Sequence, residues 1–117
     1  MNREIISEKC LALPGAVEDY QEAWGAWRYR VGNKMFALIG VYQQREIVSL
    51  KCDPFYALEL REGYTDIFPG YYLSKAHWNS IYLDGDVPEE LVVRLISDSY
   101  HLIFNSLTKN IKKELTS

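Results

Sequence analysis

The chain has 117 residues, of which 48% are hydrophobic and 25% are charged, and its formal net charge is −3. These proportions are those of one globular domain spanning residues 1–117, and they exclude an intrinsically disordered chain. The negative net charge argues against nucleic-acid binding in general, because affinity for phosphates comes mainly from clustered Lys and Arg.

The N-terminal segment and the cysteines predict a cytoplasmic protein. Residues 1–13 have an apolar face but carry four charged side chains, so the segment is neither an export signal nor a membrane span. Cys10 and Cys52 lie far apart in the sequence with no second metal ligand close by, which is typical of thiols in a reducing compartment. We expect no membrane association, and a monomer or a weak dimer.

The first half of the chain predicts a helix followed by a three-stranded antiparallel meander. Asn2 is a suitable N-cap for a helix that Pro14 and Gly15 end. The next ten residues, up to Gly25, are expected to be an irregular connection whose aromatic side chains pack toward the core. From Ala26 the apolar period changes to two. The three strands are expected over residues 26–31, 35–41 and 47–52, joined by turns at residues 32–33 and 43–45.

The second half of the chain predicts two helices separated by a fourth strand. An acidic cap followed by proline at residues 53–54 indicates a short helix that ends near Gly63. Residues 69–77 are irregular, and residues 78–83 alternate like a strand. The longest helix begins near residue 87 and has a wide apolar stripe that should lie across the sheet. Segregated helices and strands of this kind predict an α+β fold: an antiparallel sheet covered by an N-terminal, a short middle and a long C-terminal helix.

Six short blocks, spread in order along the chain, carry a resemblance to a known family. They are Leu13-Pro14-Gly15-Ala16, Lys34-Met35-Phe36-Ala37-Leu38, Leu50-Lys51-Cys52-Asp53-Pro54, Pro69-Gly70-Tyr71 with Lys75 and His77-Trp78-Asn79, Leu83-Asp84-Gly85, and Ser99-Tyr100. Their order and spacing resemble the MmcQ/YjbR family of small bacterial proteins over nearly the whole chain. Residues 21–24 depart from the family pattern, which more often reads proline, aromatic, glycine at that point.

The resemblance implies a compact fold similar to the double-wing domain of a phage transcription factor, and the family's usual description as DNA-binding derives from that likeness. On this basis we expect the exposed face of the sheet to contact DNA. The expected nucleic-acid contacts are Arg28, Arg30, Lys51, Lys75 and His77. The alternative is that the first three of these cations form the solvated side of a half-covered antiparallel sheet.

A second functional hypothesis is a non-enzymatic module that binds a small molecule or a protein in an aromatic groove. The expected groove residues are Tyr71, Tyr72, His77 and Trp78, because aromatic walls with a few polar groups are typical of ligand sites. The structural alternative is that Trp78 anchors the core, while His77 and Asn79 satisfy backbone groups of the irregular segment.

The sequence contains no pattern typical of catalysis or of cofactor binding. His77, His101, Cys10 and Cys52 lack the close pairing of zinc ligands. No nucleophile is matched to a base, and no glycine-rich loop follows a strand and opens a helix. We therefore expect no catalytic residue, no metal site and no cofactor.

Overall fold

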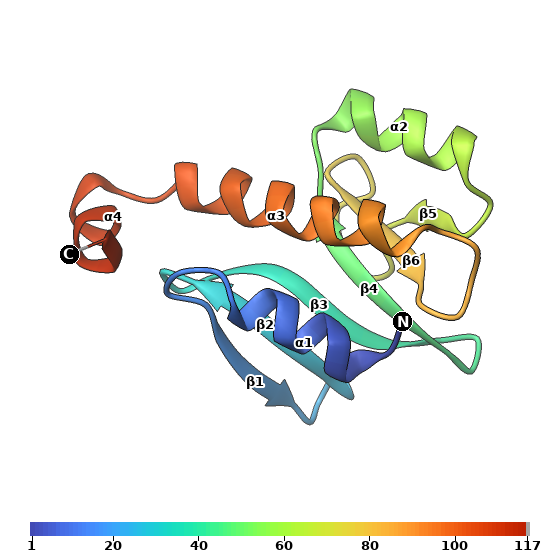
Figure 1. The fold of residues 1–117 in the computed structure, drawn as a ribbon, viewed down its shortest axis with the longest axis horizontal. Helices are drawn as coiled ribbons and strands as arrows, with labels where there is room; N and C mark the ends of the chain where they lie inside the picture. Colours follow the sequence, from blue (N-terminus) through green and yellow to red (C-terminus); the bar gives the residue numbers. More distant parts are fainter. Residues whose placement is uncertain (117) are drawn as a thin grey trace.

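The computed structural model describes residues 1–116 and contains one six-stranded sheet with helices packed on it (Figure 1). The predicted α+β class is confirmed. The elements in chain order are α1 (Arg3–Leu11), β1 (Val17–Gln21), β2 (Ala26–Val31), β3 (Lys34–Tyr42), β4 (Arg45–Lys51), α2 (Pro54–Gly63), β5 (Ile67–Pro69), β6 (Trp78–Tyr82), α3 (Glu89–Asn105) and α4 (Lys109–Thr116).

The sheet is antiparallel throughout, with the strand order β1-β2-β3-β4-β6-β5. The predicted meander forms β2, β3 and β4, and the predicted fourth strand is β6, which pairs with β4. Gly32 and Asn33 both have positive φ angles, as do Gln43 and Gln44. Two successive residues of this kind form the tight turn that matches the twist of a β-hairpin.

Local capping signals were also predicted correctly. The side chain of Asn2 accepts a hydrogen bond from the amide of Ile5 at the start of α1. The carboxylate of Asp53 accepts from the amides of Phe55 and Tyr56 at the start of α2, where Pro54 occupies the first helical position.

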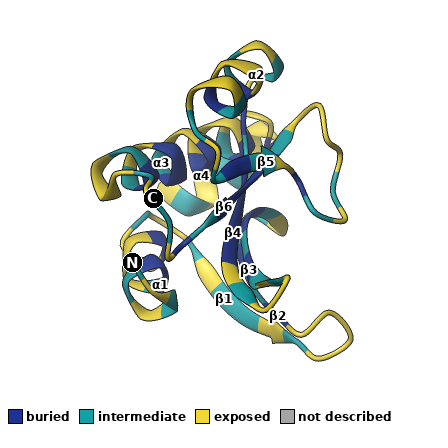
Figure 2. Ribbon diagram, turned by 90° about the vertical axis from the view of Figure 1, so that its right-hand side faces the viewer, coloured by how far each residue is buried: buried dark blue, intermediate teal, exposed yellow. Residues whose placement is uncertain are grey.

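The core lies between one face of the sheet and the helices. Helix α3 crosses β2, β3 and β4, and α1 packs against α3 and β1, so both cover the same face (Figure 2). Ser99 of α3 is fully buried at this contact. Its hydroxyl donates to the carbonyl of Phe36 in β3 and accepts from the amide of Lys51 in β4, which ties the helix to the sheet by polar contacts as well as by apolar packing.

Three parts of the fold differ from the sequence prediction. The expectation of an irregular connection between Ala16 and Gly25 was wrong, because Val17–Gln21 forms the edge strand β1. A short strand, β5, was not predicted and pairs with β6. The C-terminal helix is also divided: α3 ends at Asn105, and residues Lys109–Thr116 form the separate helix α4.

Candidate functional site

The face of the sheet opposite α1 and α3 is built from side chains that alternate with those of the core. The register places one row of residues across all six strands of this open face. The row runs Asp19, Arg28, Leu38, Ser49, Ser80 and Phe68. It begins with charged residues at β1 and β2, becomes apolar and hydroxylic in the centre, and ends at an aromatic ring.

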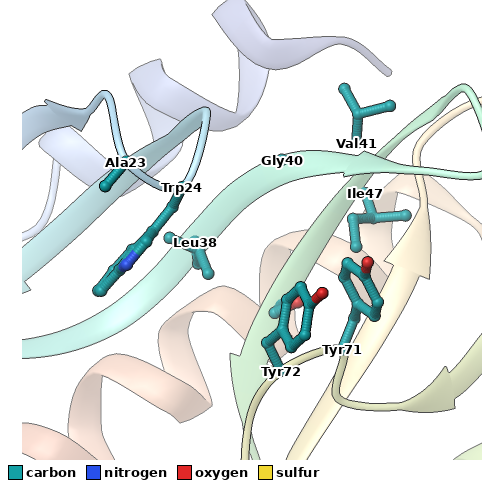
Figure 3. Close-up of a pocket in the computed structure, with 9 residues that line it drawn as sticks. Ala23, Trp24, Leu38, Gly40, Val41, Ile47, Tyr71 and Tyr72 are labelled. Carbon is teal, nitrogen blue, oxygen red and sulfur yellow. The ribbon is translucent and has the colours of Figure 1, made fainter.

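A cavity of about 550 Å³ lies on the open face, and we call it the open-face groove. Figure 3 shows Trp24 on one side of the strand segment that carries Leu38 and Gly40, with Tyr71 and Tyr72 on the other side. Trp24 belongs to the turn between β1 and β2, whereas the tyrosines follow β5. The lining residues are Ala23, Trp24, Leu38, Gly40, Val41, Ile47, Ser49, Tyr71 and Tyr72.

The two outer walls of the groove are unusually exposed aromatic side chains. Trp24 is 58% exposed and Tyr72 is 87% exposed. Tyr72 also has a φ of 63°, in the left-handed region that bulky residues seldom adopt, so the surrounding loop must hold it there.

Hydrogen bonds beneath the groove fix the loop that carries the tyrosines. The hydroxyls of Ser49 and Ser80 lie 2.6 Å apart in the buried floor, and Ser80 Oγ accepts a hydrogen bond from the amide of Tyr71. The amide of Gly70 donates to the carbonyl of Trp78 at 2.8 Å. The open-face strands thus hold the start of the loop directly.

Arg61 of α2 holds the far end of the same loop. Its guanidinium donates to Asn79 Oδ1 at 2.6 Å and to the carbonyls of Lys75 and Trp78. The Asn79 amide in turn donates to the carbonyl of Ala57 in α2. The middle helix therefore fixes the position of a segment that lines the groove, and sequence reasoning did not assign Arg61 this role.

A cluster of aromatic rings supports the tyrosine wall from behind. The ring of Tyr71 contacts Tyr42 with centroids 4.5 Å apart and Tyr72 with centroids 4.3 Å apart. Tyr42 also contacts Phe68, which contacts Tyr82. A hydrogen bond with Tyr72 and, as a smaller contribution, burial raise the pKa of the Tyr71 hydroxyl, so this hydroxyl is protonated at neutral pH.

The cations nearest to the Trp24 side are engaged with one carboxylate. Asp19 accepts two hydrogen bonds from Arg28, at 2.9 and 3.0 Å, and one from Arg30 at 3.0 Å. The hydrogen bond from Arg28 is the main reason why the pKa of Asp19 falls to about 2. The guanidinium of Arg28 lies 5.9 Å from the centroid of the Trp24 ring. This end of the open face therefore carries a partly neutralised positive cluster.

The remaining residues of the two functional hypotheses do not line the groove. Lys51 ends β4 and pairs in register with Trp78, which is half-buried on β6. Lys75 donates to the carbonyl of Gly70 within the loop. His77 is exposed, and its carbonyl accepts a hydrogen bond from the amide of Cys52. Of the expected groove residues, Tyr71 and Tyr72 line the cavity, whereas Trp78 and His77 do not.

Sequence reasoning named only Tyr71 and Tyr72 among the lining residues, and the aromatic residue that it missed is Trp24. A tryptophan at the tip of a short polar turn is a usable signal of an exposed binding residue, because its neighbours in the sequence are unable to bury it. The sequence did not show that Trp24 and Tyr72 line the same groove, because the order of the strands in the sheet is what brings the two loops to one face.

Both cysteines are free thiols and both are buried. Burial raises the pKa of Cys10 to about 12 and that of Cys52 to about 11, so both thiols are protonated at neutral pH. Residues 1–116 contain no group of three or more His, Cys, Asp and Glu side chains that could hold a metal ion. Within the same residues, no helix is both long and apolar enough to cross a membrane.

Comparisons with known proteins agree over most of the chain. A family model described as YjbR matches residues 11–102. The uncharacterised protein YjbR of Escherichia coli is 36% identical over 106 residues, which cover 91% of this chain and 90% of that protein. The uncharacterised protein YyaQ of Bacillus subtilis is 44% identical over 57 residues, or 49% of this chain and 48% of that protein.

Solved structures show the same fold. A Deinococcus radiodurans protein with a DUF419 domain superposes with a TM-score of 0.87 and 36% identity, covering 96% of this chain and 86% of that one. A Pseudomonas syringae protein superposes with a TM-score of 0.77 and 24% identity, covering 88% of this chain and 99% of that one. The second likeness concerns the fold alone.

Proposed function

This chain belongs to the YjbR family, and we propose that it is a binding module that takes a small molecule in the open-face groove. The observation that carries the proposal is the pair of exposed aromatic walls, Trp24 and Tyr72, above an apolar floor. Exposed apolar side chains that gather around one cavity, unlike singly exposed ones, often mark a place where a ligand or partner binds.

The dimensions and composition of the groove support this proposal. Its volume of about 550 Å³ falls within the range of roughly 300 to 1,000 Å³ that is usual for small-molecule sites. The floor is formed by aliphatic and small side chains with one buried hydroxyl, that of Ser49. A few polar groups within an apolar wall are what such sites use to orient a ligand.

The strain at Tyr72 is a second line of support. A left-handed backbone at a bulky residue costs about 1 to 3 kcal/mol, and it persists only where the surroundings enforce it. Here the enforcing contacts are the bond from the Tyr71 amide to Ser80 and the contact between the Tyr71 and Tyr72 rings. The fold thus keeps a destabilising backbone conformation that holds an aromatic ring over an open groove, which is consistent with a binding role.

The proposal is tested by screening the full chain against a small-molecule collection by thermal shift, then titrating the hits with variants. The double variant Trp24→Ala with Tyr72→Ala should lose binding. Phe55→Ala is the matched control, because Phe55 is a 79% exposed aromatic residue on α2 and does not line the groove. Hits that bind the double variant as tightly as the original chain would remove the groove as the site.

DNA binding through the open face is the second candidate function. It is favoured by the placement of Arg28, Arg30 and Lys51 at alternate positions of β2 and β4 that face away from α3. Lys75 and His77 would extend this surface along the loop. Against it stands the ion pairing of both arginines with Asp19, which reduces the charge available to phosphates.

Fluorescence anisotropy of labelled duplex DNA, at two salt concentrations, tests this second candidate. Phosphate contacts at this surface should give a slope of log affinity against log salt of about −3 to −5. Arg28→Ala combined with Arg30→Ala should weaken binding to all sequences alike and make the slope shallower. An unchanged affinity in that double variant would exclude both arginines from the site.

A further inference from the structure

We infer that the open-face groove accepts a flat, uncharged aromatic ring system, which stacks between Trp24 and Tyr72 over Gly40. This inference rests on the proposed small-molecule site and specifies the chemical class of its ligand. Four features of the groove carry it: a glycine in the floor, two aromatic walls, a lining without charged side chains, and a cation already placed beside Trp24.

Gly40 is a glycine that the sheet itself does not require. It lies within β3, paired with Ile47 of β4, and has no positive φ angle. A Cβ atom built there would meet only the Cβ of Ala26, at 3.6 Å, which is an ordinary contact. Glycine in a strand weakens the strand, and it often marks a place where a ligand approaches the backbone closely. The missing side chain leaves the backbone of β3 uncovered at Gly40, next to the Leu38 side chain that also lines the groove.

The walls suit a planar occupant. Figure 3 shows Trp24 and Tyr72 on opposite sides of the strand segment that carries Leu38 and Gly40, and both side chains line the groove. Aromatic rings prefer offset-stacked or edge-to-face contacts with other rings, and such pairs contribute beyond the apolar area that they bury. A ring system held between these side chains would cover both exposed faces at once.

The polar groups of the groove set the charge of the occupant. None of the lining side chains is charged. The hydroxyl of Ser49 is the buried polar group of the floor, and it suits the polar edge of a substituted or heteroaromatic ring.

A cationic ligand is disfavoured by the surroundings of Trp24. The guanidinium of Arg28 already lies 5.9 Å from the centroid of that ring, and Arg30 shares its carboxylate partner. A second cation placed on the same indole would be repelled by these charges. The arrangement therefore differs from an aromatic cage that holds a quaternary ammonium group.

The inference is tested by nuclear magnetic resonance of the isotope-labelled full chain with three probes: β-naphthol, its fully saturated analogue β-decalol, and choline. We expect β-naphthol to shift the indole N–H of Trp24 and the amides of Gly40 and Tyr72, with a Kd on the order of 1 mM. The saturated alcohol should bind at least about tenfold more weakly, and choline should leave these resonances unchanged.

Gly40→Val provides a variant that should fold and yet not bind. A β-branched residue fits a strand better than glycine does, so the melting temperature should be unchanged or higher. The added methyl groups should fill the floor and weaken β-naphthol binding by at least about tenfold, with Gly40→Ala intermediate. Unchanged affinity in Gly40→Val would show that the probe does not lie over Gly40 and would overturn the inference.

The outcomes separate this inference from the proposed function. Equal affinity for β-naphthol and β-decalol, or tighter binding of choline, would overturn the ring class while leaving the groove as a binding site. Resonances of the groove that respond to none of the three probes would overturn both statements. Shifts confined to residues of α2 and α3 would place the probe elsewhere and would also overturn both.

Discussion

The hydroxyl pair beneath the groove allows a quantitative test by a double-mutant cycle. Ser80 is fully buried, and its Oγ serves both Ser49 Oγ at 2.6 Å and the amide of Tyr71 at 3.1 Å. Ser80→Ala therefore leaves two groups without this partner. A buried polar group that loses its hydrogen bond costs about 1 to 3 kcal/mol. For the buried Ser49 hydroxyl and the half-buried Tyr71 amide together, the free energy of unfolding should fall by about 2 to 3 kcal/mol.

The other two variants of the cycle should cost less. Ser49→Ala leaves the Ser80 hydroxyl with the Tyr71 amide as a partner, and its expected cost is about 1 kcal/mol. In the double variant both hydroxyls are gone, so no unsatisfied hydroxyl remains and only the half-buried Tyr71 amide lacks its acceptor. The double variant should therefore lose about 1 to 2 kcal/mol, less than the sum of the single losses by at least about 1 kcal/mol.

The assay is urea unfolding followed by tryptophan fluorescence, with free energies taken from linear extrapolation. Ser74→Ala is the control, since Ser74 is an exposed serine of the same loop and should change stability by no more than about 0.5 kcal/mol. Losses that add within about 0.5 kcal/mol would refute the coupling of Ser49 and Ser80. A loss below about 1 kcal/mol for Ser80→Ala would refute the claim that this residue holds the Tyr71 loop.

Further predictions concern the loop and the charged end of the open face. Gly70→Ala should lower the free energy of unfolding by about 1 to 3 kcal/mol, because its Cβ would lie 2.7 Å from Trp78 Cβ and 3.1 Å from the Trp78 carbonyl. Gly63→Ala, where nothing lies within 4 Å, should be neutral or stabilising by up to about 1 kcal/mol, and equal losses in urea unfolding would contradict this contrast. Arg61→Ala should speed hydrogen exchange of the loop amides, and unchanged exchange would show that α2 does not hold the loop. The pKa of Asp19 is about 2 in the folded chain, against an ordinary value of 3.8. The ionised carboxylate therefore stabilises the fold fully at pH values above 3.8, and this contribution is lost as the pH falls toward 2. The stability difference between the original chain and Asp19→Asn should therefore shrink over that range, and a constant difference in acid unfolding curves would be evidence against the ion pairs.

Asp19→Asn also discriminates between the two candidate functions. If the open face binds DNA, releasing Arg28 and Arg30 from their carboxylate should tighten binding at low salt and steepen the salt dependence. If the groove is the functional site, the same variant should leave the affinity for β-naphthol within about twofold, because Asp19 does not line it.

Local chemistry explains which parts of the fold were predictable. The turns at residues 32–33 and 43–44, the cap at Asn2 and the Asp53-Pro54 helix start depend on preferences of a few adjacent residues. The alternation of β2 and the apolar stripe of α3 are equally readable along the chain. The α+β class follows from these signals together.

The missed elements depend on partners that are distant in sequence. The strand β1 is an edge strand without clear apolar alternation, and it forms because Asp19 and its neighbours pair with β2. The three residues of β5 are too few to show a period, and pairing with β6 defines them. The end of α3 was also hidden, because the apolar stripe continues to Leu107 although the helix ends at Asn105.

The sequence by itself thus determined the fold class, the central meander, the helix caps and the aromatic character of residues 71–72, since each arises from local preference or period. The tertiary structure alone decided that Trp24 and Tyr72 face one groove and that Gly40 forms its floor. It also decided that Asp19 pairs with Arg28 and Arg30, the two arginines that were expected to contact DNA. These relations arise from strand order and register, which join segments that have no contact until the sheet forms.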